Sequence, residues 1–292
     1  MKQSIAARRA FSRAASEYDQ HTALIRDIGQ RLLERLDGLR FQPRTIADLG
    51  CATGHQALAL HQRFPAARIL ALDSSRPMLA QARRHRGWWK HRFELVSGQI
   101  ETLPLAEDAV DLVFANLSLH GSTAIDAALA NMRRVLRPGG LLLLSVPGLD
   151  CLRELRQAWQ AVEPGTARVM PFTEVQRLGS ALTRAGFTEP VLDTDWLKST
   201  VESPTDLLQS LKCSGFINTA PARPRGLTHP DRLAKVLAAL AQSSDQGAAF
   251  QVSWEIVYAS AWAPDHGQPI RAGAGEEASM PISRIGIRRR DP

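Results

Sequence analysis

Acidic and glycine residues follow short apolar runs in the first half of the chain, in an order that could hold a nucleoside. Asp48 lies within the apolar run 45–49, and the turn after that run begins at Gly50 and closes at Gly54. Asp73 ends the next apolar run, 23 residues beyond Gly50, close to the spacing at which a carboxylate meets the hydroxyls of a ribose. The turn lacks the GxGxxG pattern that brings a helix N-terminus to a pyrophosphate. We therefore expect a nucleoside ligand that carries no phosphate.

S-adenosylmethionine is a nucleoside of this kind, because a methionine zwitterion stands where other cofactors carry phosphates. Its ammonium would interact with Asp48, its carboxylate with free backbone amides of the turn 50–54, and its ribose with Asp73. Met78 would supply a soft apolar surface for the adenine face, and the Gln99 side chain would pair with the adenine edge. The expected cofactor-binding residues are Asp48, Gly50, Cys51, Ala52, Gly54, Asp73, Ser74, Met78, Gln99, Ile100 and Asn116.

Each of these residues also has a purely structural interpretation. Glycine at Gly50 and Gly54 satisfies a tight turn, the segment 73–75 could be only a helix cap, and Met78 could be a core residue. The order of the elements on successive strand ends favours the cofactor interpretation.

Histidine and cysteine residues show no spacing that is typical of a metal site or a nucleophile. The three cysteines form no CxxC pair and leave one odd thiol, which fits a reducing, cytoplasmic compartment. His55, His61, His85 and His91 are not paired with acids on one helix face, so no metal site is expected. Cys51 is expected to be a small buried residue of the turn.

Short β-rich runs alternate with helical stretches from Thr45 to about Ser145, which is typical of a parallel sheet with helices on both faces. The predicted strands are 45–49, 68–72, 93–96, 110–115 and 141–146, with helices at 57–64, 77–85 and 124–136. Strands at 191–197 and 251–258 would extend the sheet. The expected fold class is α/β, a Rossmann-like, doubly wound, mostly parallel seven-stranded sheet that binds ligands at its carboxyl edge.

Residues 1–264 are expected to form one domain around this sheet. Residues 1–40 would form an N-terminal helical lid, 45–146 the cofactor-binding core, 150–228 a helical insertion that covers the substrate over the carboxyl edge, and 229–264 the completion of the sheet. Residues 265–292 are rich in Gly, Pro, Ser and Arg and poor in large apolar residues, so a disordered basic tail is expected.

The charge balance favours acidic partners. Lys and Arg number 36 against 29 Asp and Glu, a net charge of +7. Nucleic acid is not an expected partner, because the basic tail contains no aromatic residue to stack on bases. Apolar runs such as 141–146 are far shorter than the roughly 20 residues that span a bilayer, so no membrane segment is expected. The protein is expected to be a monomer.

Five motifs of the core resemble those of class I methyltransferases, which use S-adenosylmethionine: IADLGCATG, ALDSSRPML, SGQIETLPL, DLVFANLSL and MRRVLRPGGLLLLSV. More narrowly, the chain resembles the malonyl-[acyl-carrier protein] O-methyltransferases of biotin synthesis over about residues 6–264, through AFSRAASEYDQHT, LRELRQAWQAV, LKCSGFINTAPARPRGLT and WEIVYASAWAP. It departs from the family pattern at Ala52, where glycine is usual, at Gln99, where an acid is common, and at 120–122, where an aromatic and a cysteine are frequent.

The resemblance implies transfer of the sulfonium methyl group to the free carboxylate of a malonyl thioester on acyl carrier protein, which leaves S-adenosylhomocysteine and begins pimeloyl synthesis. A carboxylate with a pKa of roughly 4 is already ionised at neutral pH, so no general base or other catalytic residue is expected. Tyr18 would close over the cofactor from the lid. The expected substrate-binding residues are Tyr18, His21, Asn116, Arg223 and Arg225.

Acyl carrier proteins are acidic, so basic residues near the mouth of the site would steer their approach. The residues expected to do so are Arg153, Arg156, Lys198, Lys212, Arg223, Arg225, Arg232 and Lys235.

Two alternative functions remain open. A methyltransferase for another small acid or a quinone precursor would share everything between residues 45 and 146, although the segment 211–228 argues against it. A non-methylating relative, either an arginine hydroxylase-like assembly factor or a pseudoenzyme, is compatible with Ala52, Gln99 and the altered segment 120–122.

Overall fold

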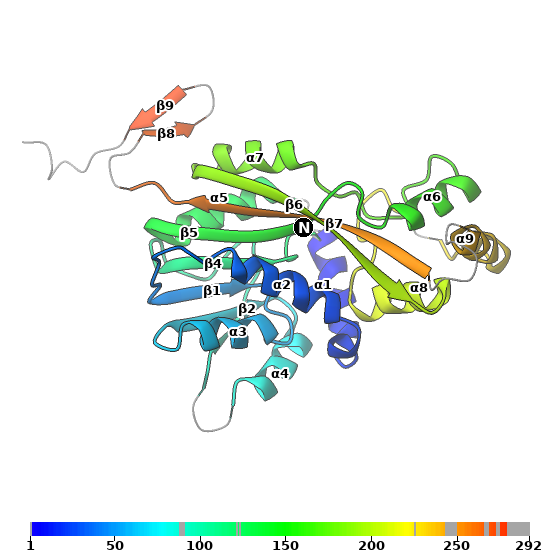
Figure 1. Cartoon of the computed structure of the whole chain (residues 1–292), viewed down its shortest axis with the longest axis horizontal. Coiled ribbons are helices and arrows are strands. Elements are labelled where there is room, and N and C mark those ends of the chain that lie inside the picture. Colours follow the sequence, from blue (N-terminus) through cyan, green and yellow to red (C-terminus); the bar gives the residue numbers. More distant parts are fainter. Residues whose placement is uncertain are drawn as a thin grey trace, which may run out of the picture.

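Seven strands form one sheet in the order β3-β2-β1-β4-β5-β7-β6 (Figure 1). The computed structural model describes residues 2–87, 91–120, 122, 124–224, 226–242, 250–265, 269–272 and 275–278. The strands are β1 (Thr45–Leu49), β2 (Arg68–Asp73), β3 (Glu94–Ser97), β4 (Val110–Asn116), β5 (Leu136–Pro147), β6 (Thr188–Val201) and β7 (Phe250–Trp262). This arrangement confirms the expected Rossmann-like α/β class.

The central strand β1 is the point where the order of the sheet reverses. Ile46 pairs with Ile69 of β2 on one side and with Leu112 of β4 on the other, both in parallel register. Ligands of open α/β sheets bind at such switch points, outside the carboxyl ends of the strands. The strand β7 alone runs antiparallel, between β5 and β6.

Alternating residues of the central strands face two separate cores, because successive side chains of a strand point to opposite faces. In β5, Leu141 and Leu143 belong to one core and Leu142 and Leu144 to the other. Helices α2 (Ala23–Glu34), α3 (His55–Arg63) and α4 (Arg76–His85) contribute to the first core. Helices α5 (Ile125–Val135) and α7 (Val175–Arg184) cover the opposite face. Burial on both faces explains the nearly continuous apolar runs of these strands.

The N-terminal segment 1–40, expected to form a helical lid, contains three helical pieces. Helix α1 (Lys2–Ala14) ends before a 3₁₀ turn, η1 (Tyr18–Gln20), and α2 follows. At this break the Thr22 hydroxyl donates to the Tyr18 carbonyl at 2.8 Å, a local bond that competes with continuous helix. Helix α1, η1 and the first turn of α2, which carries Ile25 and Arg26, lie at the carboxyl edge, whereas the rest of α2 packs on the sheet.

The segment 150–228, expected to cover the carboxyl edge as one helical insertion, also divides. Helix α7 packs beside α5 on a sheet face, since Leu178, Ala181 and Leu182 form one buried stripe, and β6 is the edge strand. Helices α6 (Arg153–Val162), α8 (Pro204–Cys213) and α9 (Pro230–Gln242) group beyond the carboxyl ends (Figure 1). Helix α9 packs against α6, although its residues were assigned to sheet completion.

Part of the segment expected to be a disordered tail forms a hairpin. Strand β8 (Pro269–Ala272) pairs antiparallel with β9 (Gly275–Ala278), separate from the main sheet. Pairing of β8 with β9 satisfies their backbone hydrogen-bonding groups without a hydrophobic core. The amino-acid composition, which reports only on core formation, therefore did not predict this hairpin. The remainder of the expected tail, including 288–290, lies outside the described residues. Within the described part of the chain, no helix has both the length and the apolar character to cross a membrane.

Candidate functional site

A cleft opens at the carboxyl ends of β1, β2 and β4, beneath α1 and η1. It encloses about 940 Å³ including its open mouth, which is the size of a site for a nucleoside-sized ligand. Eight of the predicted site residues line it: Tyr18, Gly50, Ala52, Asp73, Ser74, Gln99, Ile100 and Asn116. Residues from five separate sequence segments therefore meet at one sheet edge, four of them at or after strand ends as their order predicted.

The turn after β1 lets a ligand approach the backbone closely. Gly50 has a φ of +74°, and a Cβ there would lie 2.5 Å from the Cβ of Ser118. Gly54 has a φ of +86° and donates its amide to the Cys51 carbonyl at 2.8 Å. Ala52 holds a φ of +46° without being a glycine, which gives a backbone reason for the glycine expected at this position in the family.

The amides of this turn are bonded within the protein. Gly50 and Cys51 both donate to the Leu72 carbonyl, at 2.8 and 3.0 Å, and Ala52 donates to Asp73 Oδ2 at 3.0 Å. Binding of the ligand's carboxylate by the amides of this turn stays a prediction, and the amides of Gly50, Cys51, Ala52 and Gly54 already have partners within the protein. These bonds to the Leu72 carbonyl join the turn after β1 to the end of β2.

The carboxylate of Asp73 is held in one orientation at the floor of the cleft. Its Oδ1 accepts from the Ser75 amide at 2.7 Å and its Oδ2 from Ala52. Burial raises the pKa of Asp73, and the amide bonds of Ser75 and Ala52 oppose that shift. A carboxylate offers about four lone-pair positions, so both oxygens can still accept from ribose hydroxyls. The helix cap is Ser75, whose Oγ accepts from the Met78 amide, so Asp73 remains available to a ligand.

A second hollow adjoins the cleft and contains an unsatisfied acid. Asp48 is 1% exposed, and its Oδ2 has no hydrogen-bond partner among the described residues. Burial, followed by repulsion from Asp73, raises the pKa of Asp48 to about 8. Arg26 and Cys51 line the same hollow, together with Tyr18. An acid and a cation on one small hollow match a zwitterion, so this is the candidate site for the amino-acid end of the cofactor.

Arg26 was missed by the sequence analysis. Its guanidinium donates to the Asp19 carbonyl at 2.8 Å, which holds it beside the hollow. It lies eight residues after Tyr18, about two helical turns, and this spacing on a predicted lid could have indicated it.

Asn116 connects the end of β4 to the N-terminal helices. Its side-chain nitrogen donates to the Ile25 carbonyl at 2.9 Å, and its Oδ1 accepts from the Ser145 hydroxyl at 2.7 Å. The carboxamide lines both hollows with its orientation fixed by these two bonds. One amide hydrogen remains for a ligand.

Several predicted residues lie away from the cleft. Met78 is fully buried against Ala14, Ala15 and Tyr18, so it supports the lid from behind and is not in the wall that described residues form. From the sequence, the place of Met78 on the buried face of α4 is equally compatible with packing against α1 and with contact to an adenine ring. Arg223 is exposed and does not belong to that wall, and Arg225 lies outside the described residues.

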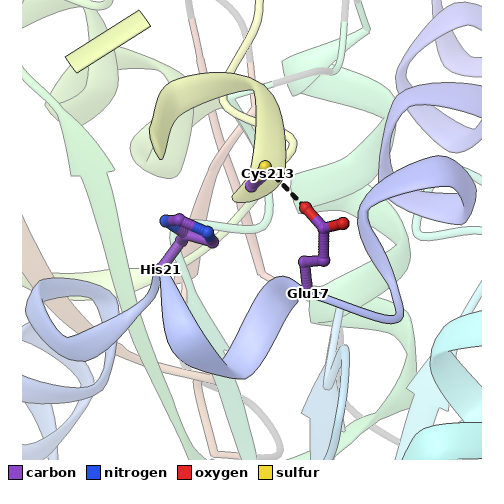
Figure 2. Close-up of side chains that lie close together, drawn as sticks. All are labelled: Glu17, His21 and Cys213. Atoms are coloured by element: carbon purple, nitrogen blue, oxygen red, sulfur yellow. Dashed lines mark hydrogen bonds between the residues drawn. The ribbon is translucent and has the colours of Figure 1, made fainter. Parts of the chain in front are cut away.

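His21 belongs to a different group of side chains, shown in Figure 2. It lies near Glu17 and Cys213, where the Cys213 thiol donates to Glu17 Oε2 at 3.0 Å. Burial and the neighbouring Glu17 carboxylate raise the pKa of Cys213, so the thiol stays protonated. This contact joins the end of α8 to the N-terminal segment and does not place His21 at the cleft.

Aromatic rings form the outer wall of the cleft. His120 stacks on Phe216 with ring centroids 4.4 Å apart, and Phe11 contacts His120 edge-on at 5.6 Å. The Nδ1 of His120 lies 2.7 Å from the Leu117 carbonyl, and burial lowers the pKa of the ring, so the imidazole is neutral. His120 thus takes the place of the aromatic residue that the family pattern led us to expect.

A further, apolar hollow lies behind this wall. It shares His120 and Ser122 with the cleft and is otherwise lined mainly by Met170, Phe172 and other apolar residues. From the sequence, His120 was recognised only as a departure from the family pattern. Its role in the wall was not predicted, because its stacking partner Phe216 is distant in the sequence.

Comparison with known proteins agrees with this geometry. Residues 46–140 match the methyltransferase domain family. In the phosphoethanolamine N-methyltransferase 2 of Haemonchus contortus, solved in complex with S-adenosyl-L-methionine, the same fold recurs with a TM-score of 0.51 and 16% identity, over 81% of this chain and 52% of that one. The YcgJ protein from Bacillus subtilis has a TM-score of 0.58 at 15% identity, over 81% and 98%.

Relatives in sequence are much closer. The malonyl-[acyl-carrier protein] O-methyltransferase of Xylella fastidiosa is 41% identical over 97% of this chain and 96% of its own. The protein of the same name from Halorhodospira halophila is 38% identical over 97% and 95%. With the cofactor cleft at the sheet edge, these likenesses show a methyltransferase whose methyl donor is S-adenosylmethionine. The chain belongs to the malonyl-[acyl-carrier protein] O-methyltransferase family.

Proposed function

We propose that this protein transfers a methyl group from S-adenosylmethionine to the free carboxylate of a malonyl thioester on acyl carrier protein, the ester that begins pimeloyl synthesis for biotin. The observation that carries the proposal is that the cleft lined by Asp73 adjoins the hollow lined by Asp48 and Arg26. The names of the curated relatives support the acceptor.

The residues present fit the methyl donor at both of its ends. The unpartnered Asp48 oxygen would hold the ammonium, Arg26 the carboxylate, and Asp73 the ribose hydroxyls. Gln99 and Ile100 would contact the adenine. When bound, S-adenosylmethionine supplies an electrophilic methyl group on its sulfonium.

The residues of the chain have a positioning role in this reaction. The acceptor carboxylate is already ionised, so rate enhancement rests on in-line placement and on exclusion of water. Phe11, His120 and Phe216 form an apolar wall, and Tyr18, which is 8% exposed, closes the cleft from η1. Burial raises the pKa of Tyr18 far above neutrality, so its phenol can donate a hydrogen bond and does not act as a base.

We place the carrier-protein contact on the basic side chains of the covering helices. Arg153, Lys212 and Arg223 are exposed, and Arg153 would exchange its ion pair with Glu154 for an acidic partner. Arg156 has a different task, because its guanidinium donates to the carbonyls of Leu149 and Cys151 and so holds the loop before α6.

Charge reversal distinguishes the contribution of this basic surface to carrier-protein binding from the contribution of the cleft to catalysis. Changing Arg153, Lys212 and Arg223 together to Glu should lower kcat/KM on malonyl carrier protein about tenfold at low salt, and much less on malonyl-coenzyme A. Reversal of Arg84 and Arg177, which are exposed on α4 and α7, is the matched control. Equal losses on both thioesters would contradict a carrier-protein contact on this surface.

The function itself is tested with methyl-labelled S-adenosylmethionine and malonyl carrier protein, followed by mass spectrometry of the product. The expected result is a labelled methyl ester on the malonyl group. Faster methylation of free malonate or a quinone precursor would favour a different acceptor class. Binding of S-adenosylmethionine without any transfer would overturn the proposal in favour of a non-methylating relative.

A further inference from the structure

Three metal-ligating side chains from three elements meet beside the cofactor turn. Asp19 comes from η1, His55 begins α3, and His85 ends α4. Their ligand atoms all lie within 4.8 Å of one another. The Nε2 of His55 is 3.3 Å from Asp19 Oδ1, and the Nε2 of His85 is 3.7 Å from Asp19 Oδ2. The sequence analysis expected no metal site because it considered only pairs within one helix.

The Nε2 atoms of both imidazoles are available as ligands, in His85 because its other ring nitrogen is hydrogen-bonded and in His55 because its Nε2 has no hydrogen-bond partner among the described residues. The Nδ1 of His85 lies 2.8 Å from the Thr53 carbonyl, which can only accept, so Nδ1 carries the hydrogen and Nε2 carries the lone pair. The Nε2 of His55 is buried and, within the described part of the chain, has no hydrogen-bond partner despite its distance to Asp19. Metal-bound histidines usually donate their other ring nitrogen to a carbonyl in just this way.

We propose that Asp19, His55 and His85 bind a divalent transition cation of the Zn²⁺ class, which ties the N-terminal lid to the cofactor turn. Ligand atoms about 2.1 Å from a tetrahedral ion lie about 3.4 Å from one another. The distance from His55 Nε2 to Asp19 Oδ1 matches this spacing, His85 Nε2 approaches the other Asp19 oxygen, and the ligand atoms of the three residues all lie within 4.8 Å of one another. All three side chains are about one-third exposed, and a water would be the fourth ligand of the ion.

The surroundings of Asp19 support its role as a ligand. The Thr53 hydroxyl donates to Asp19 Oδ1 at 2.6 Å and orients the carboxylate toward the two rings. Arg26 donates to the backbone carbonyl of Asp19, which leaves the carboxylate oxygens to other partners. Burial lowers the pKa of His55, which favours the neutral ring that a metal requires.

The group of Glu17, His21 and Cys213 in Figure 2 is a weaker candidate for the same ion. Its thiol donates to Glu17 and is held protonated, whereas a metal binds the thiolate. A cation there would first have to displace the proton of Cys213. The two groups are therefore distinguishable by the residues whose loss abolishes binding.

An ion at Asp19 would act on the lid. Asp19 directly follows Tyr18 in η1, and Thr53 directly follows Ala52 in the turn, so the ion would hold the two walls of the cofactor cleft together. Opening of α1 and η1 should become slower when the ion is bound. This consequence does not depend on the identity of the methyl acceptor.

The test uses the full chain, freed of metal, and Zn²⁺ in competition with a chromophoric chelator. His85→Gln retains an amide that can donate to the Thr53 carbonyl but lacks the ligating nitrogen, and it should weaken Zn²⁺ binding at least about tenfold. Cys213→Ser and His91→Gln are the matched controls and should change the affinity less than about twofold. Circular dichroism melting verifies that each variant is folded.

Limited tryptic cleavage after Arg13, which is exposed in α1, supplies a second readout. Zn²⁺ should slow this cleavage several-fold in the unchanged protein and not in His85→Gln. The proposal is overturned if Zn²⁺ binds the unchanged protein no tighter than His85→Gln, or if Cys213→Ser removes the binding. Neither readout measures methyl transfer, so failure of the proposed function would leave this result intact.

Discussion

The cofactor end and the acceptor end of the site are built in different ways. At the cofactor end, Asp48 and Asp73 extend from adjacent buried strands, and backbone amides fix the Asp73 carboxylate. At the acceptor end, the wall consists of rings contributed by α1 and by three connecting segments, namely Phe11, His120, Phe172 and Phe216. Chemistry common to all methyltransferases can reside in the sheet, while acceptor choice depends on how separate segments pack together.

The largest expected effect comes from Asp73→Asn at the cofactor end. The amide group would point a donor at the amide of Ala52 or of Ser75, and it would lose the charge that favours the ribose hydroxyls. S-adenosylmethionine should bind about 100-fold more weakly, since each bond to a charged group is worth about 1.5 to 3 kcal/mol. Titration calorimetry measures the affinity, with Asp126→Asn on the surface as control. A loss below threefold would show that the ribose is held elsewhere.

Asp48→Asn tests the amino-acid end through pH. In the ligand-free protein the pKa of Asp48 is raised to about 8, so the carboxylate that attracts an ammonium forms only as the pH approaches that value. Affinity for S-adenosylmethionine should therefore rise from pH 6 to pH 9 in the unchanged protein. The variant should bind about tenfold more weakly at pH 9, with a flat profile. Titration calorimetry between pH 6 and pH 9 measures these affinities. If affinity changes with pH equally in both proteins, Asp48 does not bind the ammonium.

The same raised pKa predicts an opposite trend in stability. The folded state binds the Asp48 proton more tightly than the unfolded state, so the stabilisation is complete below the unfolded pKa near 4 and is lost as pH rises through about 8. Urea unfolding of the ligand-free protein should show this decline, and Asp48→Asn should lessen it. The carboxylate thus destabilises the free protein at the pH where it is needed for binding.

At the acceptor end, Phe172→Ala should act on the substrate alone. Phe172 packs on Phe216 at 6.0 Å and lines the apolar hollow, not the cofactor cleft. The expected result is about a tenfold loss of kcat/KM for malonyl carrier protein, about 1.4 kcal/mol, with S-adenosylmethionine affinity changed less than about twofold. Leu39→Ala, at a large apolar residue that is exposed away from the hollow, is the control. Parallel losses in both measurements would mean that the two ends are not separable.

The smallest effect is expected for Ala52→Gly in the turn between β1 and α3. Ala52 has a φ of +46°, where a side chain is strained, while glycine loses more conformational freedom on folding. The two terms nearly cancel, and the variant should be more stable by about 0.5 kcal/mol in urea unfolding. A clear loss of stability would show that the methyl group of Ala52 packs usefully against the lid.

The sheet and the position of the strand-end acids at the cleft and its adjoining hollow followed from the sequence because their signals are local. Apolar runs gave β1 at its observed bounds, and the acids at strand ends identified Asp48 and Asp73. The strand β6 was predicted too short, since its alternating exposed residues resemble a loop more than a buried strand.

The remaining features depend on contacts between distant segments. The Leu72 carbonyl that occupies the turn amides, and the rings that stack on His120, become neighbours only in the folded chain. Met78 shows the same limit, because a helical period marks a buried face without stating what covers it. The meeting of Asp19, His55 and His85 likewise required three elements to be placed in space.

The antiparallel pairing of β6 and β7 would allow the segment between these two strands to be replaced. These strands pair along almost their whole length, from Val201 with Phe250 to Thr188 with Trp262, and the chain between them carries α8 and α9. A different excursion could be spliced between Val201 and Phe250 while the ladder keeps its register. Acceptor preference could in this way diversify among relatives, or be transplanted by an engineer, without rebuilding the machinery that grips the methyl donor.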